Sequence, residues 1–187
     1  MQQLYPTMQL DRDMGQSLWS YSNLGHWGYT CDTGRLQSPV NLDTSTAECV
    51  SWGPIEFDDY GSGRVTVRNT GHSAQVDGFT EWAQKPHVTG GNLPGKYYLQ
   101  QFHLHWGDND SVGSENTIDG RHYSAEVHFV HFMEGLNTTS EAAKTPHGIA
   151  VIALLMQAAP DGMALQGLEN AITEIRTPGK CQKLDSI

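Results

Sequence analysis

The chain has 187 residues, which suits one domain, and its modest hydrophobic fraction of 37% with twenty glycines fits a loop-rich β protein. Eleven lysines and arginines against twenty-one aspartates and glutamates give a formal net charge of −10, which argues against nucleic acid and anionic membranes as partners. No segment is long and apolar enough to predict a membrane span.

The first part of the chain predicts an extension followed by short strands. Residues 1–18 are polar and have no apolar segment of the kind that signal peptides contain, so we expect an N-terminal extension. Strands are predicted at residues 55–57 and 64–69, where apolar and polar residues alternate. His87 follows in a region rich in glycine and proline, so we expect it on the surface.

A long strand is predicted from Tyr97 to Trp106, and it contains the motif Gln-Phe-His-Leu-His-Trp-Gly at residues 101–107. In a strand, residues i and i+2 point to the same face. Gln101, His103 and His105 therefore share one face, while the apolar residues between them face the core. Two imidazoles side by side, with an amide next to them, make half of a metal site.

A second strand predicted from Ser124 to Phe132 supplies the other half. Glu126 and His128 share a face of this strand by the same alternation. Neighbouring strands lie about 4.8 Å apart, so an adjacent antiparallel strand can add a third imidazole to the cluster. His131 competes for this place, but it lies on the opposite face from Glu126, which favours His128.

The predicted cluster of His103, His105 and His128 has the donor set of a catalytic zinc site. Three neutral nitrogen ligands leave a fourth tetrahedral position open. Gln101 and Glu126 each precede a ligand histidine by two residues. Each is predicted to orient that histidine by accepting a hydrogen bond from the ring N–H that does not bind the metal. A His-x-His pair alone is more often a surface or core feature, but the second strand and the two acceptors favour metal binding.

The last part of the chain predicts one strand and one helix. The continuous apolar run from Gly148 to Met156 indicates a strand that is buried on both faces. Apolar residues recur at helical spacing between about Met163 and Arg176, which predicts an amphipathic helix.

These motifs, in this order, resemble the alpha-class carbonic anhydrases. The resemblance is carried by residues 101–107, by Gly113-Ser114-Glu115 and by Ala125-Glu126-Val127-His128-Phe129-Val130-His131. Further matches are Trp19-Ser20-Tyr21, Gly25-His26-Trp27, Gly34-Arg35-Leu36-Gln37-Ser38-Pro39-Val40 and Asn69-Thr70-Gly71-His72. The resemblance starts at about Trp19 and implies a single mainly β domain with a large twisted, mostly antiparallel central sheet and few short helices.

The resemblance implies zinc-dependent, reversible hydration of CO2 to bicarbonate and a proton by zinc-bound hydroxide. By the same resemblance His72 carries the proton out of the site, since an imidazole exchanges protons near neutral pH. Glu115 would accept a hydrogen bond from a threonine hydroxyl, and Tyr21 would line the mouth of the site. For Tyr21 taken alone, ordinary aromatic packing is the simpler interpretation.

The resemblance also assigns the substrate pocket. Gln75 would line its polar wall, and Val130 and Val151 would form the apolar wall against CO2. Both valines also suit a plain hydrophobic core, and the two roles are compatible.

The sequence departs from the family pattern in two places. Asn116 stands where the family normally has a histidine, so we expect a hydrogen bond to be kept while the volume of the ring is lost. The Leu-Thr-Thr-Pro-Pro segment, with the threonine partner of Glu115, does not occur in the sequence, so we expect a C-terminally incomplete domain over residues 19–187. The alternative function is therefore a catalytically impaired carbonic-anhydrase-like binding module, and a zinc hydrolase acting on esters is a further one.

The cysteines and sequons bear on the compartment. In secreted members of the family, a cysteine at the place of Cys31 pairs with one near the segment just described. Cys49 and Cys181 are the other candidate partners, and three cysteines leave at least one unpaired within the chain. Together with sequons at Asn109 and Asn137, Cys31 favours a secreted, extracellular or periplasmic location.

Overall fold

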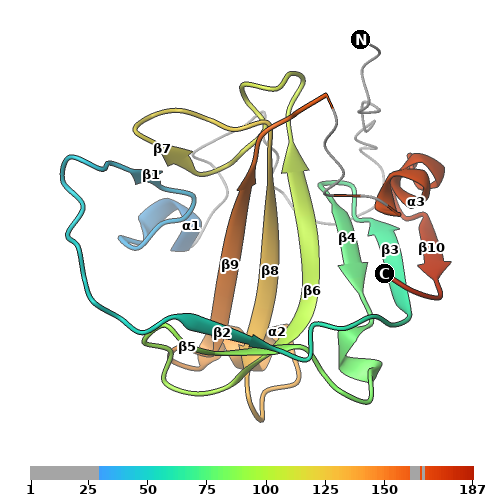
Figure 1. Ribbon diagram of the computed structural model, residues 1–187, viewed down its shortest axis with the longest axis horizontal. Coiled ribbons are helices and arrows are strands. Elements are labelled where there is room, and N and C mark those ends of the chain that lie inside the picture. Colours follow the sequence, from blue (N-terminus) through green and yellow to red (C-terminus); the bar gives the residue numbers. More distant parts are fainter. Residues whose placement is uncertain (1–29, 161–164, 166) are drawn as a thin grey trace.

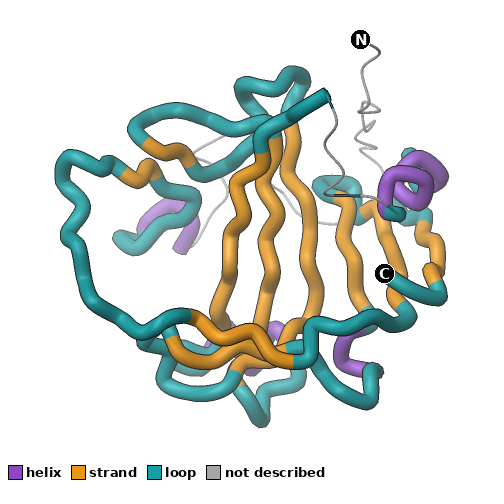
Figure 2. Tube along the Cα trace, in the orientation of Figure 1, coloured by secondary structure: helices purple, strands orange, loops and turns teal. Residues whose placement is uncertain are grey.

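The structure is a computed structural model that describes residues 30–160, 165 and 167–187 (Figure 1). These residues form an eight-stranded antiparallel sheet, a separate two-stranded parallel pair and a few short helices. Figure 2 shows the strands gathered in the middle of the molecule, with long loops around them. This architecture confirms the predicted mainly β fold class. Within the described residues, no helix has the length and apolar character needed to cross a membrane.

Six strands of the large sheet lie side by side in the order β10, β3, β4, β6, β8 and β9. Their bounds are Cys181–Leu184 for β10, Val65–Asn69 for β3, Ala74–Asp77 for β4, Tyr97–Trp106 for β6, Ala125–Met133 for β8 and Ile149–Met156 for β9. The other two strands, β5 (His87–Gly90) and β2 (Ile55–Asp58), extend the sheet from the first residues of β6. The predicted positions of β2, β3, β6 and β8 are confirmed to within a residue at each end.

The remaining elements are short. They are α1 (Thr30–Thr33), α2 (Thr139–Lys144), α3 (Leu168–Glu174), the 3-10 helix η1 (Phe79–Glu81) and the parallel pair β1 (Asn41–Leu42) and β7 (Thr117–Ile118). A capping box begins α2, because the Thr138 side chain accepts from the backbone N–H of Glu141 and the Glu141 carboxylate accepts from the backbone N–H of Thr138.

A β-bulge divides β6 into two parts that face differently. The register with β8 shifts between Leu99 and Gln101, so Gln100 is an extra residue. Before the bulge, the odd-numbered Leu99 is buried; after it, the even-numbered Phe102 and Leu104 are buried instead. The bulge therefore turns the odd-numbered residues from Gln101 onward away from the core.

The main core lies on one face of the sheet and is closed by α3. Leu168, Ala171 and Ile175 of the α3 region are buried in the same cluster as Val65 and Val67 of β3. Figure 1 shows α3 beside β3 and β10. The predicted helix over 163–176 is thus confirmed for Leu168–Glu174, while residues 161–164 and 166 lie outside the described residues.

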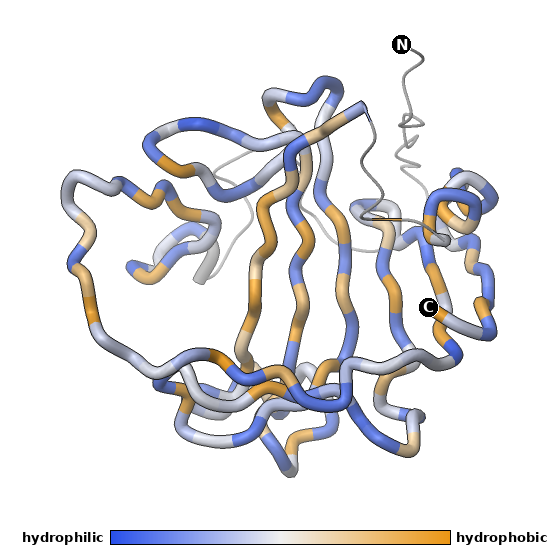
Figure 3. Tube along the Cα trace, in the orientation of Figure 1, coloured by the Kyte–Doolittle hydropathy of each residue, from blue (hydrophilic) through white to orange (hydrophobic). Residues whose placement is uncertain are grey.

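The prediction that the apolar strand β9 is buried on both faces is wrong. Val151 is 51% exposed on one face and Leu154 is 53% exposed on the other. Among the described residues β9 pairs with β8 alone, so it is an edge strand with no neighbour to shield it. Figure 3 shows hydrophobic colour along most of its length.

His87 also differs from the expectation, since it is only 9% exposed. It lies in β5, which is paired with β2 on one edge and with β6 on the other. Its ring packs on Tyr98, with centroids 5.4 Å apart, and its Nε2 lies 3.7 Å from Asp58 Oδ2. Pairing on both edges of β5 buries a residue that the glycine- and proline-rich context placed on the surface.

Candidate metal centre

The three predicted ligand histidines meet on the face of the sheet opposite the core. His103 of β6 and His128 of β8 are direct cross-strand partners, and His105 is two residues further along β6. One ring nitrogen from each residue can be chosen so that all three lie within 4.8 Å of one another. The ring centroids are 4.9 Å apart for His103–His105, 5.2 Å for His103–His128 and 4.7 Å for His105–His128.

The side chains that precede two of the histidines hold them as the sequence predicts. His103 Nδ1 lies 2.9 Å from Gln101 Oε1, and His128 Nε2 lies 2.8 Å from Glu126 Oε1. Both partner oxygens only accept, so each of these ring nitrogens donates its proton. The tautomers leave Nε2 of His103 and Nδ1 of His128 as the nitrogens with a lone pair for a metal.

Glu126 is completely buried and saturated with N–H donors. Its Oε2 accepts from the backbone N–H groups of Glu115 and Asn116, both at 2.8 Å, and its Oε1 accepts from the Asn116 amide as well as from His128. Burial raises the pKa of Glu126, but the hydrogen bonds from Asn116 and His128 outweigh it and bring the pKa below its ordinary value. The carboxylate is therefore ionised and acts as an acceptor only.

The surroundings keep His103 and His105 neutral. Burial, followed by the charges of the neighbouring imidazoles, lowers the pKa of His103 to about 4. The pKa of His105 is lowered to about 4 by burial and by His128. Neutral imidazoles keep the lone pairs that a metal needs, so the cluster is prepared for a cation at neutral pH.

Glu115 brings a carboxylate to the rim of the cluster. Its Oε1 lies 3.3 Å from His105 Nδ1, and its Oε2 lies 3.9 Å from His128 Nδ1. It is placed by its own backbone N–H, which donates to the buried Glu126.

The donor set fits zinc. Three imidazole nitrogens within reach of one ion, two of them held by oxygen acceptors, match three-ligand zinc sites with an open fourth position. Imidazole also suits copper, iron and nickel, so the cluster could hold any of several transition metals, of which zinc is one.

The residues predicted to line the substrate pocket lie next to the cluster in the register. Gln75 of β4 is the cross-strand partner of His103. Val130 follows His128 by two residues and pairs directly with Val151 of β9. His72 lies in the turn that leads into β4, where its backbone N–H donates to Thr70 Oγ1 at 3.3 Å. Tyr21 lies outside the described residues.

His131, the weaker candidate for the third ligand, points away from the cluster. It is completely buried on the core-side face of β8, where its Nε2 bonds the hydroxyl of Tyr60. Sequence reasoning missed this Tyr60–His131 pair, and it expected a hydrogen bond from Asn116 without identifying its partner, Glu126. Both join residues of different elements, and no local pattern marks them.

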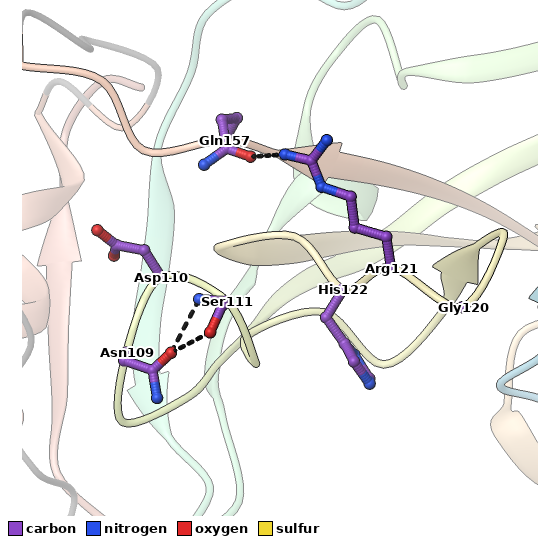
Figure 4. Close-up of a pocket in the computed structure, with 7 residues that line it drawn as sticks. All are labelled: Asn109, Asp110, Ser111, Gly120, Arg121, His122 and Gln157. Carbon is purple, nitrogen blue, oxygen red and sulfur yellow. Dashed lines mark hydrogen bonds between the residues drawn. The ribbon is translucent and has the colours of Figure 1, made fainter.

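One pocket of the described structure is separate from the metal centre. It has a volume of about 510 Å³ and is lined by Asn109, Asp110, Ser111, Gly120, Arg121, His122 and Gln157 (Figure 4). Asn109 Oδ1 accepts from the backbone N–H of Ser111 at 3.0 Å, and Arg121 reaches Gln157 at 3.4 Å. This polar hollow contains none of the predicted site residues.

The cysteines form no disulfide with each other in the described structure. Cys49 and Cys181 are both free and exposed. The side chain of Cys31, for which the sequence left the pairing open, lies outside the described part of the structure.

The described structure is thus a mainly β sheet that carries, on one face, three imidazoles that could hold a metal ion. Comparison with known proteins identifies the family: the model of the eukaryotic-type carbonic anhydrases matches residues 15–187, and the chain belongs to that family. The match begins inside the segment that the sequence predicted to be an N-terminal extension.

Three curated relatives give the degree of similarity. Human carbonic anhydrase 7 is 36% identical over 172 residues, which cover 88% of this chain and 65% of the relative. Human carbonic anhydrase 3 is 37% identical over 86% of this chain and 63% of the relative. Putative carbonic anhydrase 5 of Caenorhabditis elegans is 38% identical over 74% of this chain and 45% of the relative. The chain thus spans less than two thirds of the length of these relatives, and secretion stays a prediction.

Proposed function

We propose that this chain carries out the reversible, zinc-dependent hydration of CO2 to bicarbonate and a proton. The observation that supports this most strongly is the cluster of His103, His105 and His128, whose ligand nitrogens lie within 4.8 Å of one another. Membership of the carbonic anhydrase family and the two acceptors behind the histidines support the same reaction.

In this proposal His103 and His105 from β6 and His128 from β8 hold the zinc. When bound, zinc lowers the pKa of a coordinated water to about 7 and so supplies a nucleophile at neutral pH; carbonic anhydrase is the standard example of this effect. Gln101 orients the ring of His103 by accepting a hydrogen bond from its Nδ1, and Glu126 orients the ring of His128 by accepting one from its Nε2. In each ring the other nitrogen is then the metal ligand.

The substrate would approach along the face of the sheet that carries the three histidines. Val130 and Val151, paired across β8 and β9, offer apolar surface to the nonpolar CO2 molecule. Gln75, beside His103, offers an amide on the polar side. His72 would accept the proton that the reaction releases and pass it to buffer.

The test is stopped-flow CO2 hydration by the full chain with stoichiometric zinc. We expect fast turnover that is removed by chelation and lost in His103→Ala and in His128→Ala. His147→Asn is the matched control, because His147 is exposed, lies outside the cluster and has a φ of 58°, which asparagine tolerates. If His128→Ala kept both zinc content and turnover, the ligand assignment would be wrong.

One observation favours the binding module as the second candidate. The carboxylate of Glu115 lies 3.3 Å from His105 Nδ1 and 3.9 Å from His128 Nδ1, the nitrogen of His128 that would hold the metal. A chain that binds zinc but hydrates CO2 no faster than His103→Ala would support this candidate. A faster turnover of activated esters than of CO2 would instead support the zinc hydrolase.

A further inference from the structure

We propose that the protein has a second small-molecule site, an apolar pocket on the core side of β6 that takes a ligand the size of a single benzene ring. The pocket has a volume of about 160 Å³. It lies on the face of the sheet opposite the three ligand histidines, since its β6 residues Leu99 and Phe102 belong to the buried core. This site is therefore separate from the metal centre of the proposed function and does not depend on zinc.

Aromatic side chains form much of the pocket wall. Phe79 lies edge-on to Trp82, with ring centroids 5.2 Å apart, and its centroid is 5.8 Å from that of Phe102. Phe102 is the cross-strand partner of Phe129, and their centroids are 5.3 Å apart. Aromatic pairs are favourable at these separations, so one further ring can pack against the same wall.

One side of the pocket is buried and the other is open. Leu99 and Phe79 are 2% and 4% exposed, whereas Tyr60 is 37% exposed and the neighbouring Gly61 is exposed as well. Ile187, which is partly buried against the core, completes the lining. A ligand can therefore enter beside residues 60 and 61 without any opening of the core.

The polar side-chain atoms of the wall already have partners. The Tyr60 hydroxyl bonds His131 Nε2, and Trp82 Nε1 donates to the backbone carbonyl of Arg64 at 2.8 Å. Among the described residues, the buried side-chain polar atoms without a partner all lie outside the lining. Water finds few hydrogen bonds in such a space: an engineered apolar cavity of about 150 Å³ stays dry and binds benzene or xenon. The similar volume and the apolar wall of this pocket favour a small apolar ligand over a polar one.

Benzene is the probe for the test, which uses the full chain. We expect benzene to raise the melting temperature in a saturable way, because a ligand that binds only the folded state stabilises it. In NMR spectra we expect intermolecular NOEs from benzene to the methyl groups of Leu99 and Ile187, which both line the pocket. A metal chelator should change neither result.

Gly61→Phe tests the site by mutation, and Gly53→Phe is its matched control. Both glycines are exposed, neither has a positive φ, and a Cβ at either would meet no heavy atom within 4 Å, so both variants should fold. Of the two, only Gly61 lines the pocket, where the new ring would compete with the ligand. We expect the dissociation constant of benzene to rise about 10-fold in Gly61→Phe, the equivalent of roughly two buried CH2 groups, and to stay unchanged in Gly53→Phe.

Three results would overturn this site. Benzene could leave the melting temperature unchanged, it could give NOEs to Val151 and Leu154 of the exposed strand β9 instead, or it could bind equally to the two glycine variants. If Gly61→Phe does not fold, the NOEs of the wild-type chain carry the test. Zinc affinity and CO2 turnover are measured separately on the same chain, and their failure would overturn the proposed function while leaving the apolar site in place.

Discussion

At the scale of single residues, the candidate metal site contains two histidines, His103 and His105, that the fold keeps neutral at neutral pH. His103 and His105 each have a pKa of about 4, against an ordinary value of 6.5, because burial disfavours their charged form. Between these two values the unfolded chain binds more protons than the folded protein. The free energy of unfolding of the zinc-free protein should therefore fall as the pH falls from 6.5 to 4.

Urea unfolding in the presence of a chelator, at pH 7 and at pH 4.5, measures this loss. His103→Asn removes one of the two groups, so it should show a smaller difference between the two pH values than the wild type. An equal pH dependence in both proteins would mean that the pKa of His103 is the same in the folded and unfolded states. That result would contradict the lowered pKa of His103 in the folded protein.

At the scale of elements, the loop between β6 and β8 carries Glu115 and Asn116 to the site, and Gly113 sets its path. The backbone N–H of Gly113 donates to Tyr123 O at 2.9 Å, and a Cβ at this position would overlap the backbone carbonyl of Ser124. We expect Gly113→Ala to push the loop away from β8, to lower stability and to weaken zinc binding at least 10-fold.

Thr138→Ala provides the comparison for Gly113→Ala. It removes the side-chain half of the capping box of α2, which should cost about 1 kcal/mol of unfolding free energy. Because α2 follows β8 at the end away from Glu126, zinc affinity should not change. Thermal melts and chelator competition on both variants separate a general loss of stability from a loss that reaches the site.

Much of the fold and of the site could be predicted because strands have a period of two. Alternation alone put His103 and His105 on one face, and it separated His128 from His131. Alternation does not show which strands lie beside β9. The continuous apolar sequence of β9 was therefore predicted to be buried on both faces. Nor could alternation reveal Asn116 on Glu126 or Tyr60 on His131, since these contacts depend on how loops return to the sheet.

At the scale of the whole molecule, we expect the exposed edge of β9 to promote association of chains at high concentration. Eight apolar residues without a charge or a proline, exposed on both faces, favour pairing with another chain. Leu154→Lys places a charge on the face away from the histidines and should reduce concentration-dependent association. Light scattering across a dilution series measures this, with zinc content as the control; unchanged scattering would place the association elsewhere.

The bulge in β6 has a consequence for the kinds of change this protein can accept. Gln100 shifts the alternation of the strand by one residue. Odd-numbered residues face the core before it and face away from the core after it. Substitutions within β6 keep that frame and alter one side chain at a time. Deleting Gln100 would make Leu99 and Gln101 neighbours on opposite faces, so a regular strand would keep His103 and His105 on their present face and Leu99 in the core. Gln100 is therefore the position in β6 at which the strand should accept the loss of one residue with its histidine face unchanged.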